Sequence, residues 1–188
     1  MSNSILKLLF CVCFLASCEI LNSAPERVNP HAALIADFQT RVANYLKLRQ
    51  QAEKDLRPLK PTDSAERIAE QERALAERIT RLRAGAKKGE IFTPPIVGEF
   101  RRLLRIAGEG AHASEIRRSL RSAEPVHLAL RVNQGYPKSV PLQSTPATVL
   151  RNLPALPKQV EYRVIGHDLI LRDIGANLVI DFADGVVP

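Results

Sequence analysis

The sequence predicts an α+β fold, and three patterns along the chain indicate it. Between residues 31 and 86, apolar residues recur at alternating three- and four-residue spacing in two segments, as in amphipathic helices. Six prolines lie between residues 125 and 158, too many for a long helix. From residue 160 to 182, short apolar runs alternate with turn residues, the pattern of an antiparallel β-meander. We therefore expect an N-terminal antiparallel helical hairpin, short basic helices, a proline-rich connection and a C-terminal three-stranded antiparallel meander.

The first helix is expected to begin at Pro30 with Asn29 as its cap, because a proline in the first turn costs no helical hydrogen bond. It should end before Pro58, and Arg49 is the one polar interruption of its apolar face. That face consists of Ile35, Phe38, Val42, Tyr45, Ala52 and Leu56.

The second helix is predicted from the capping-box spacing of Asp63 and Glu66. Its apolar face consists of Ala65, Ile68, Leu75, Ile79, Leu82 and Ala86, with Glu72 as an interruption. The short connection between the two helices predicts an antiparallel hairpin over residues 31–86, with Leu75 facing the Val42–Tyr45 region. We expect this hairpin to pack within the chain; the alternative is a coiled-coil element that docks or oligomerises.

A third, basic helix is expected to start at Thr93-Pro94-Pro95 and to stop at Gly108-Glu109-Gly110, with a fourth at 112–121. The apolar residues of the third helix, Ile96, Phe100, Leu103 and Leu104, should face inward, and its arginines Arg101, Arg102 and Arg105 should face outward. Residues 31–121 contain 19 basic and 12 acidic residues, whereas residues 122–188 contain six of each. This asymmetry predicts that the three arginines bind an anionic lipid surface or envelope polymer; the alternative is an ordinary solvated face.

Three strands are predicted near the end of the chain, over residues 160–165, 168–172 and 177–182, with turns at Gly166-His167 and Asp173–Ala176. The stretch from Glu161-Tyr162-Arg163 to Asp181-Phe182 is similar to the ends of exported bacterial proteins of unknown function. That similarity implies no activity. With only 5% aromatic residues and no tryptophan, the core is expected to be aliphatic.

The N-terminus has the order of a secretory signal: Lys7, an apolar run from Leu8 to Ala16, and then small residues. The uncharged run ends at Cys18 and is about half the ~20 residues that cross a bilayer. Residues Leu15-Ala16-Ser17-Cys18 resemble the lipobox of bacterial lipoproteins. The resemblance implies that Cys18 becomes the acylated first residue of the mature chain. The alternative is an ordinary signal cut near Asn22-Ser23-Ala24.

The predicted organisation is a signal peptide over 1–17, a lipid-anchored tether over 18–30, a helical region over 31–121, and the proline-rich passage with the meander over 122–188. The length of 188 residues suits packing of the last two regions as one domain. An exported protein of the cell envelope or periplasm, held at the membrane by lipid, is the expected localisation. A protein partner is compatible with this arrangement, whereas the scarcity of aromatic residues and the export signal argue against nucleic acid.

Catalytic motifs are weak. The glycine pattern at Gly108–Ala113 follows a helix rather than a strand, so no dinucleotide cofactor is expected. His112 and Glu115 lack a third ligand, so no metal is expected. The sequence therefore predicts a non-enzymatic adaptor or binding module. The alternative is a small envelope hydrolase that uses His167 with Asp168 or Asp173.

Overall fold

The computed structural model describes residues 29–54, 56–109, 114, 129–137 and 151–187. Its α+β architecture confirms the predicted fold class. Three helices, α1 (Pro30–Glu53), α2 (Ala65–Leu82) and α3 (Pro94–Glu109), precede three strands, β1 (Val160–Ile165), β2 (Asp168–Asp173) and β3 (Leu178–Ala183). The strands form an antiparallel sheet of order β1-β2-β3. Apart from residue 114, the helix expected at 112–121 lies outside the described residues.

Helix α1 begins as the sequence predicts. The Asn29 side chain accepts a hydrogen bond from the backbone N–H of His31 at 3.0 Å, and Pro30 occupies the first turn. The buried residues of α1 follow the expected face and are Phe38, Val42, Tyr45, Arg49 and Ala52. Arg49, the polar interruption of that face, is therefore part of the interior.

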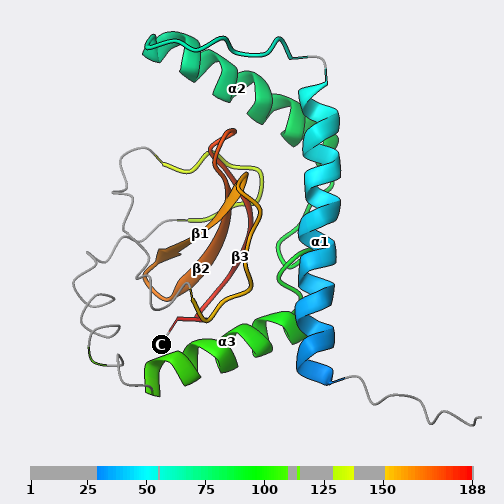
Figure 1. Cartoon of the computed structure of the whole chain (residues 1–188), viewed down its shortest axis with the longest axis vertical. Coiled ribbons are helices and arrows are strands. Elements are labelled where there is room, and N and C mark those ends of the chain that lie inside the picture. Colours follow the sequence, from blue (N-terminus) through cyan, green and yellow to red (C-terminus); the bar gives the residue numbers. More distant parts are fainter. Residues whose placement is uncertain (1–28, 55, 110–113, 115–128, 138–150, 188) are drawn as a thin grey trace, which may run out of the picture.

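Helix α2 differs from the expectation in its cap and in its buried face. Ser64 is the N-cap rather than Asp63, because its hydroxyl accepts from the backbone N–H of Arg67 at 3.3 Å. Only Leu75 and Ile79 of its apolar face are buried, whereas Ile68 and Leu82 are 47% and 44% exposed. Figure 1 shows the reason: α2 approaches α1 at a steep angle, so its N-terminal half lies away from that helix. The seam between the two helices is short.

Sheet β1-β2-β3 has two covered faces. One face packs against the helices in the main core and presents residues such as Val160, Tyr162 and Val164. A smaller cluster on the other face consists of Tyr136, Ile165, Ile170, Val179 and Phe182. Residues 133–136 extend the sheet beyond β3, since Asn133 and Tyr136 donate backbone hydrogen bonds to Val179 and Asn177 at 2.9 and 2.7 Å.

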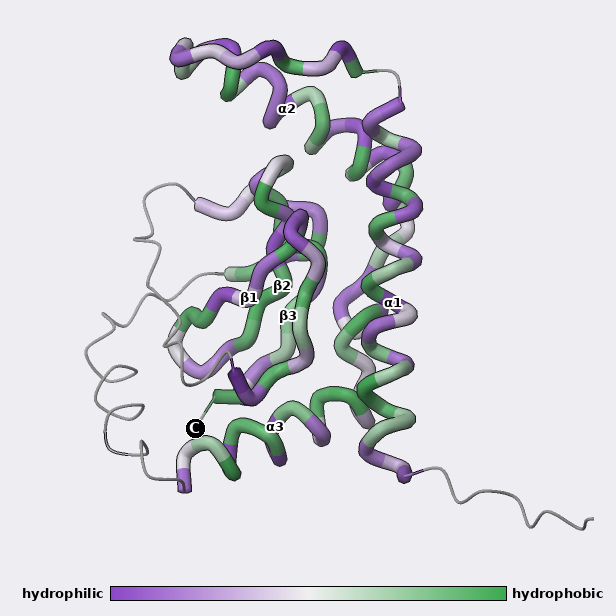
Figure 2. The backbone as a smooth tube through the Cα atoms, in the orientation of Figure 1, coloured by the Kyte–Doolittle hydropathy of each residue, from purple (hydrophilic) through white to green (hydrophobic). Residues whose placement is uncertain are grey.

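Most buried hydrophobic residues are aliphatic, as the composition predicts, and a small group of aromatic rings lies among them. Phe38 of α1, Phe92 and Phe100 lie with ring centroids 4.9 to 5.7 Å apart. Tyr162 of β1 packs on Phe100 at 6.1 Å. Four of the seven aromatic residues in the described part of the chain gather where α1, α3 and the sheet meet, because large rings exclude the most water per residue. Figure 2 shows hydrophobic residues along the strands and α3, and a largely hydrophilic α2.

Within the described residues, no helix has both the length and the apolar character needed to cross a membrane.

Candidate functional site

The basic face of α3, defined as Arg101, Arg102 and Arg105, is the site that the sequence singles out. The backbone carbonyls of Asp184 and Gly185 accept hydrogen bonds from Arg101 at 2.9 and 3.2 Å, so its charge meets no carboxylate there. Arg105 is exposed, and its neighbour Ile106 is 49% exposed. An exposed isoleucine beside arginines that meet no carboxylate in the described part of the chain is a combination that suits the boundary between water and lipid.

Arg102 has a different role from its two neighbours. It donates two hydrogen bonds to Glu99, one turn earlier in α3, at 2.9 and 2.5 Å. The Glu99 side chain is only 2% exposed. Hydrogen bonds from Arg102 lower the pKa of the Glu99 carboxyl below its ordinary value, since they stabilise its ionised form. The charge of Arg102 is therefore balanced locally.

The start of α1 joins this site through Glu99. Nδ1 of His31, the second residue of α1, lies 2.6 Å from Oε2 of Glu99. Figure 1 shows that α1 begins at the same end of the molecule as α3. The segment predicted to be a tether, residues 18–30, thus leads directly into the contact with the basic face.

The alternative hydrolase residues are brought together only in part. His167 and Asp168 lie at the turn between β1 and β2. His167 Nδ1 is 2.9 Å from the carbonyl oxygen of Val187, and Asp168 accepts from the backbone N–H of Gly185 at 2.9 Å. Both therefore fasten the C-terminal tail. Asp173 lies at the other end of β2 from Asp168, about 17 Å along the strand at the usual rise per residue. The structure therefore does not bring Asp173 next to His167.

Asp173 instead forms a buried polar network with α1. Its side chain is 0% exposed, and Oδ2 accepts from Tyr45 Oη and Arg49 Nε, each at 2.7 Å. Oδ1 accepts from the backbone N–H of Ala176 at 2.8 Å, which closes the turn between β2 and β3. Burial, followed by the nearby Asp173 charge, raises the pKa of the Tyr45 hydroxyl. The sequence gives one clue to this network, a charged residue at a core position of α1.

A second buried carboxylate holds the loop between α2 and α3. Asp181 is 0% exposed and accepts four backbone N–H groups, from Gly89, Ile91, Phe92 and Phe182, at 2.8 to 2.9 Å. These bonds fix the loop that leads into α3. The arrangement positions the basic face and leaves this carboxylate inaccessible for chemistry.

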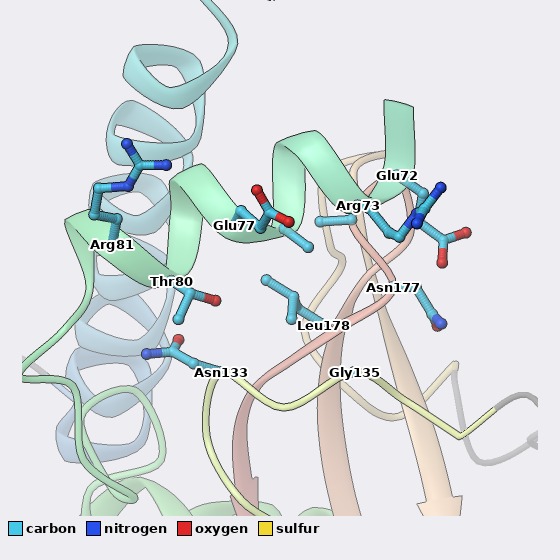
Figure 3. Close-up of a pocket in the computed structure, with 11 residues that line it drawn as sticks. Glu72, Arg73, Glu77, Thr80, Arg81, Asn133, Gly135, Asn177 and Leu178 are labelled. Atoms are coloured by element: carbon cyan, nitrogen blue, oxygen red, sulfur yellow. The ribbon is translucent and has the colours of Figure 1, made fainter. Parts of the chain in front are cut away.

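Two open clefts flank α2. The first has a volume of about 540 Å³ and lies between α2 and the edge of the sheet; Figure 3 shows Thr80 of α2 facing Asn133 across it. The second, of about 440 Å³, lies between α1 and the loop after α2, and Arg41, Tyr45 and Arg83 contribute to it. One polar side chain of the first cleft is engaged within the protein: Asn133 exchanges hydrogen bonds with Arg83 at 2.8 and 2.9 Å.

A metal centre is not formed by the part of the chain that the structure describes, where no three His, Cys, Asp or Glu side chains gather. Cys18, the predicted lipidation site, and the pair His112 and Glu115 lie outside the described residues. Comparison of the chain with protein-family models, with curated proteins and with solved structures finds no match.

Proposed function

We propose that this chain is an exported envelope protein, anchored through lipid on Cys18, whose domain is a non-enzymatic binding module at an anionic membrane surface. The contact between His31 and Glu99 is the observation that carries the proposal. This contact holds His31, which follows the proposed tether, against Glu99, the partner of Arg102 in the basic face of α3. A lipid at Cys18 would therefore hold this face near the membrane.

The length of the tether is compatible with that placement. From Cys18 to Asn29 the chain can extend at most about 40 Å, at roughly 3.3–3.6 Å per residue. Basic residues near an anionic surface contribute about 1 kcal/mol each. Arg101 and Arg105 meet no carboxylate among the described residues, so together they can strengthen binding about thirtyfold.

A binding role is also supported by the structural contacts that the candidate catalytic residues make. His167 and Asp168 hold the C-terminal tail, and Asp173 is buried against Tyr45 and Arg49. A general acid or base must reach the substrate within hydrogen-bond distance. Asp173, with no exposed surface, cannot do so in this conformation.

Metabolic labelling with a fatty acid tests the anchor. The native chain should incorporate the label, and Cys18→Ser should not, because the thioether forms on that sulfur. Cys13→Ser is the matched control and should keep the label, since it lies within the predicted signal peptide. An unlabelled native chain would overturn the proposed anchor.

Vesicle co-sedimentation tests the surface. The mature chain 18–188 carrying Cys18→Ser should bind phosphatidylglycerol vesicles more tightly than phosphatidylcholine vesicles, and the preference should weaken with salt as the Debye length shortens. Replacing Arg101, Arg102 and Arg105 with glutamine should remove most of the preference. Lysine at the same positions should retain it, which separates charge from loss of structure.

A matched control removes the same charge elsewhere. Arg57 and Lys60 are exposed in the connection after α1, and Arg67 is exposed in the first turn of α2. Figure 1 shows this connection and the start of α2 at the end of the molecule opposite α3, so replacement of the three residues with glutamine should leave binding almost unchanged. Equal losses in the two triple variants would show that binding follows net charge alone and would contradict an oriented surface.

A further inference from the structure

The contact between α1 and α3 joins a half-exposed histidine to a buried carboxylate. His31 is half exposed, with a side chain 50% accessible, while its partner Glu99 is 2% accessible. Oε2 of Glu99 lies 2.6 Å from His31 Nδ1 and accepts from Arg102 Nε at 2.9 Å. The buried carboxylate of Glu99 therefore contacts two basic side chains: Arg102, which is always charged, and His31, whose imidazole is charged only when protonated.

The charge of this triad, defined as His31, Glu99 and Arg102, follows from its members. When the imidazole is neutral, Glu99 and Arg102 cancel and the triad carries no net charge. When the imidazole is protonated, the triad carries a charge of +1. Histidine is the side chain that ordinarily changes charge between pH 5 and 8.

We propose that His31 makes the affinity of the basic face for anionic membranes increase as the pH falls. This inference rests on the proposed function, because it assigns a regulation to the same surface. At higher pH the face presents Arg101 and Arg105, which no carboxylate of a described residue neutralises, and protonation of His31 adds a third charge beside them. One additional charge near an anionic surface corresponds to about fivefold tighter binding.

Few other charged groups face His31. On α3 these are Glu99 and Arg102, and among the described residues neither forms an ion pair with any other group. On α1 itself, the contact next to His31 is the uncharged Asn29 cap. His167 is the other described histidine near the α3 end, since it bonds Val187 while Arg101 bonds Gly185 in the same tail.

Binding to phosphatidylglycerol vesicles at pH 5.5 and 7.5 tests the inference, because the phosphodiester stays anionic over this range. The mature chain 18–188 with Cys18→Ser is used throughout, with far-ultraviolet circular dichroism of each variant at both pH values. The parent should bind about fivefold more tightly at pH 5.5. His31→Gln should bind equally at both values, at the level of the parent at pH 7.5. His31→Lys should also bind equally at both, at the level of the parent at pH 5.5.

His167→Gln is the matched control and should retain the fivefold response of the parent. A response that persists in His31→Gln, or that disappears in His167→Gln, would overturn the role of His31. A parent that prefers phosphatidylglycerol equally at both pH values would overturn this inference and leave the proposed function standing. A parent with no preference over phosphatidylcholine at either pH would overturn both.

Discussion

Replacing Asp173 with asparagine is expected to destabilise the domain strongly, although the two side chains have nearly the same shape. Asp173 is fully buried and accepts hydrogen bonds on both oxygens, from Tyr45 and Arg49 on one and from the backbone of Ala176 on the other. Asparagine supplies one oxygen and one NH₂ group. Either Ala176 or the pair from α1 would then face a donor instead of an acceptor.

The magnitude follows from the burial of the ion pair. Arg49 and Asp173 are 9% and 0% exposed, so the substitution leaves a buried guanidinium whose one remaining charged partner among the described residues is Glu53, at 2.6 Å. Breaking one side of a buried pair costs about 3–5 kcal/mol. With a urea dependence of about 2 kcal/mol per molar, the midpoint of unfolding should fall by about 1.5–2.5 M.

Urea unfolding followed by far-ultraviolet circular dichroism provides the measurement. Asp37→Asn is the matched control, because Asp37 pairs with Arg41 at 2.9 Å on the surface of α1, where such pairs contribute about 0–1 kcal/mol. A loss below about 1 kcal/mol for Asp173→Asn, equal to that of the control, would refute the reasoning.

Three further outcomes are expected. Leu75→Ala should cost about 2–5 kcal/mol in urea unfolding and Ile68→Ala less than about 0.5, because only the first is buried; similar costs would contradict the short seam of α2. Asp181→Asn should lower the thermal midpoint by several degrees, since four backbone donors lose a carboxylate; an unchanged midpoint would argue against its role in the loop. Burial raises the pKa of Tyr45 and of Tyr162. The stability that the two neutral hydroxyls contribute is therefore complete below the ordinary tyrosine pKa of about 10 and is lost as the pH rises above it. Tyrosinate absorbance at 295 nm should then increase together with loss of the folded circular dichroism signal. Ionisation of both tyrosines in a chain that keeps its native dichroism would contradict this link between ionisation and unfolding.

The sequence predicted the local elements well because their signals are local. Asn29 and Pro30 mark the start of α1, and the strands lie within one residue of their predicted bounds. The cap of α2 was displaced by one residue, since Ser64 and Asp63 are both good caps and only the backbone geometry selects between them. The exposed Ile68 shows the limit of periodicity, which defines an apolar face and leaves open what covers it.

The candidate site was likewise predicted from the sequence only in part. Sequence alone assigned Arg101, Arg102 and Arg105 to one basic helix. It also predicted lipidation at Cys18, which stays a prediction because the described residues do not include it. Glu99 also lies at an inward position of α3, between Ile96 and Phe100, but its sequence position gives no partner.

Tertiary structure alone decided which charges meet. Arg49 and Asp173 are 124 residues apart, and His31 and Glu99 are 68 apart, so no spacing rule connects them. A helix or strand forms from interactions over a few residues, so the sequence pattern that predicts it lies within its own residues. A charge buried with the core must find an opposite partner wherever the fold provides one, and that choice is made only when the elements pack together.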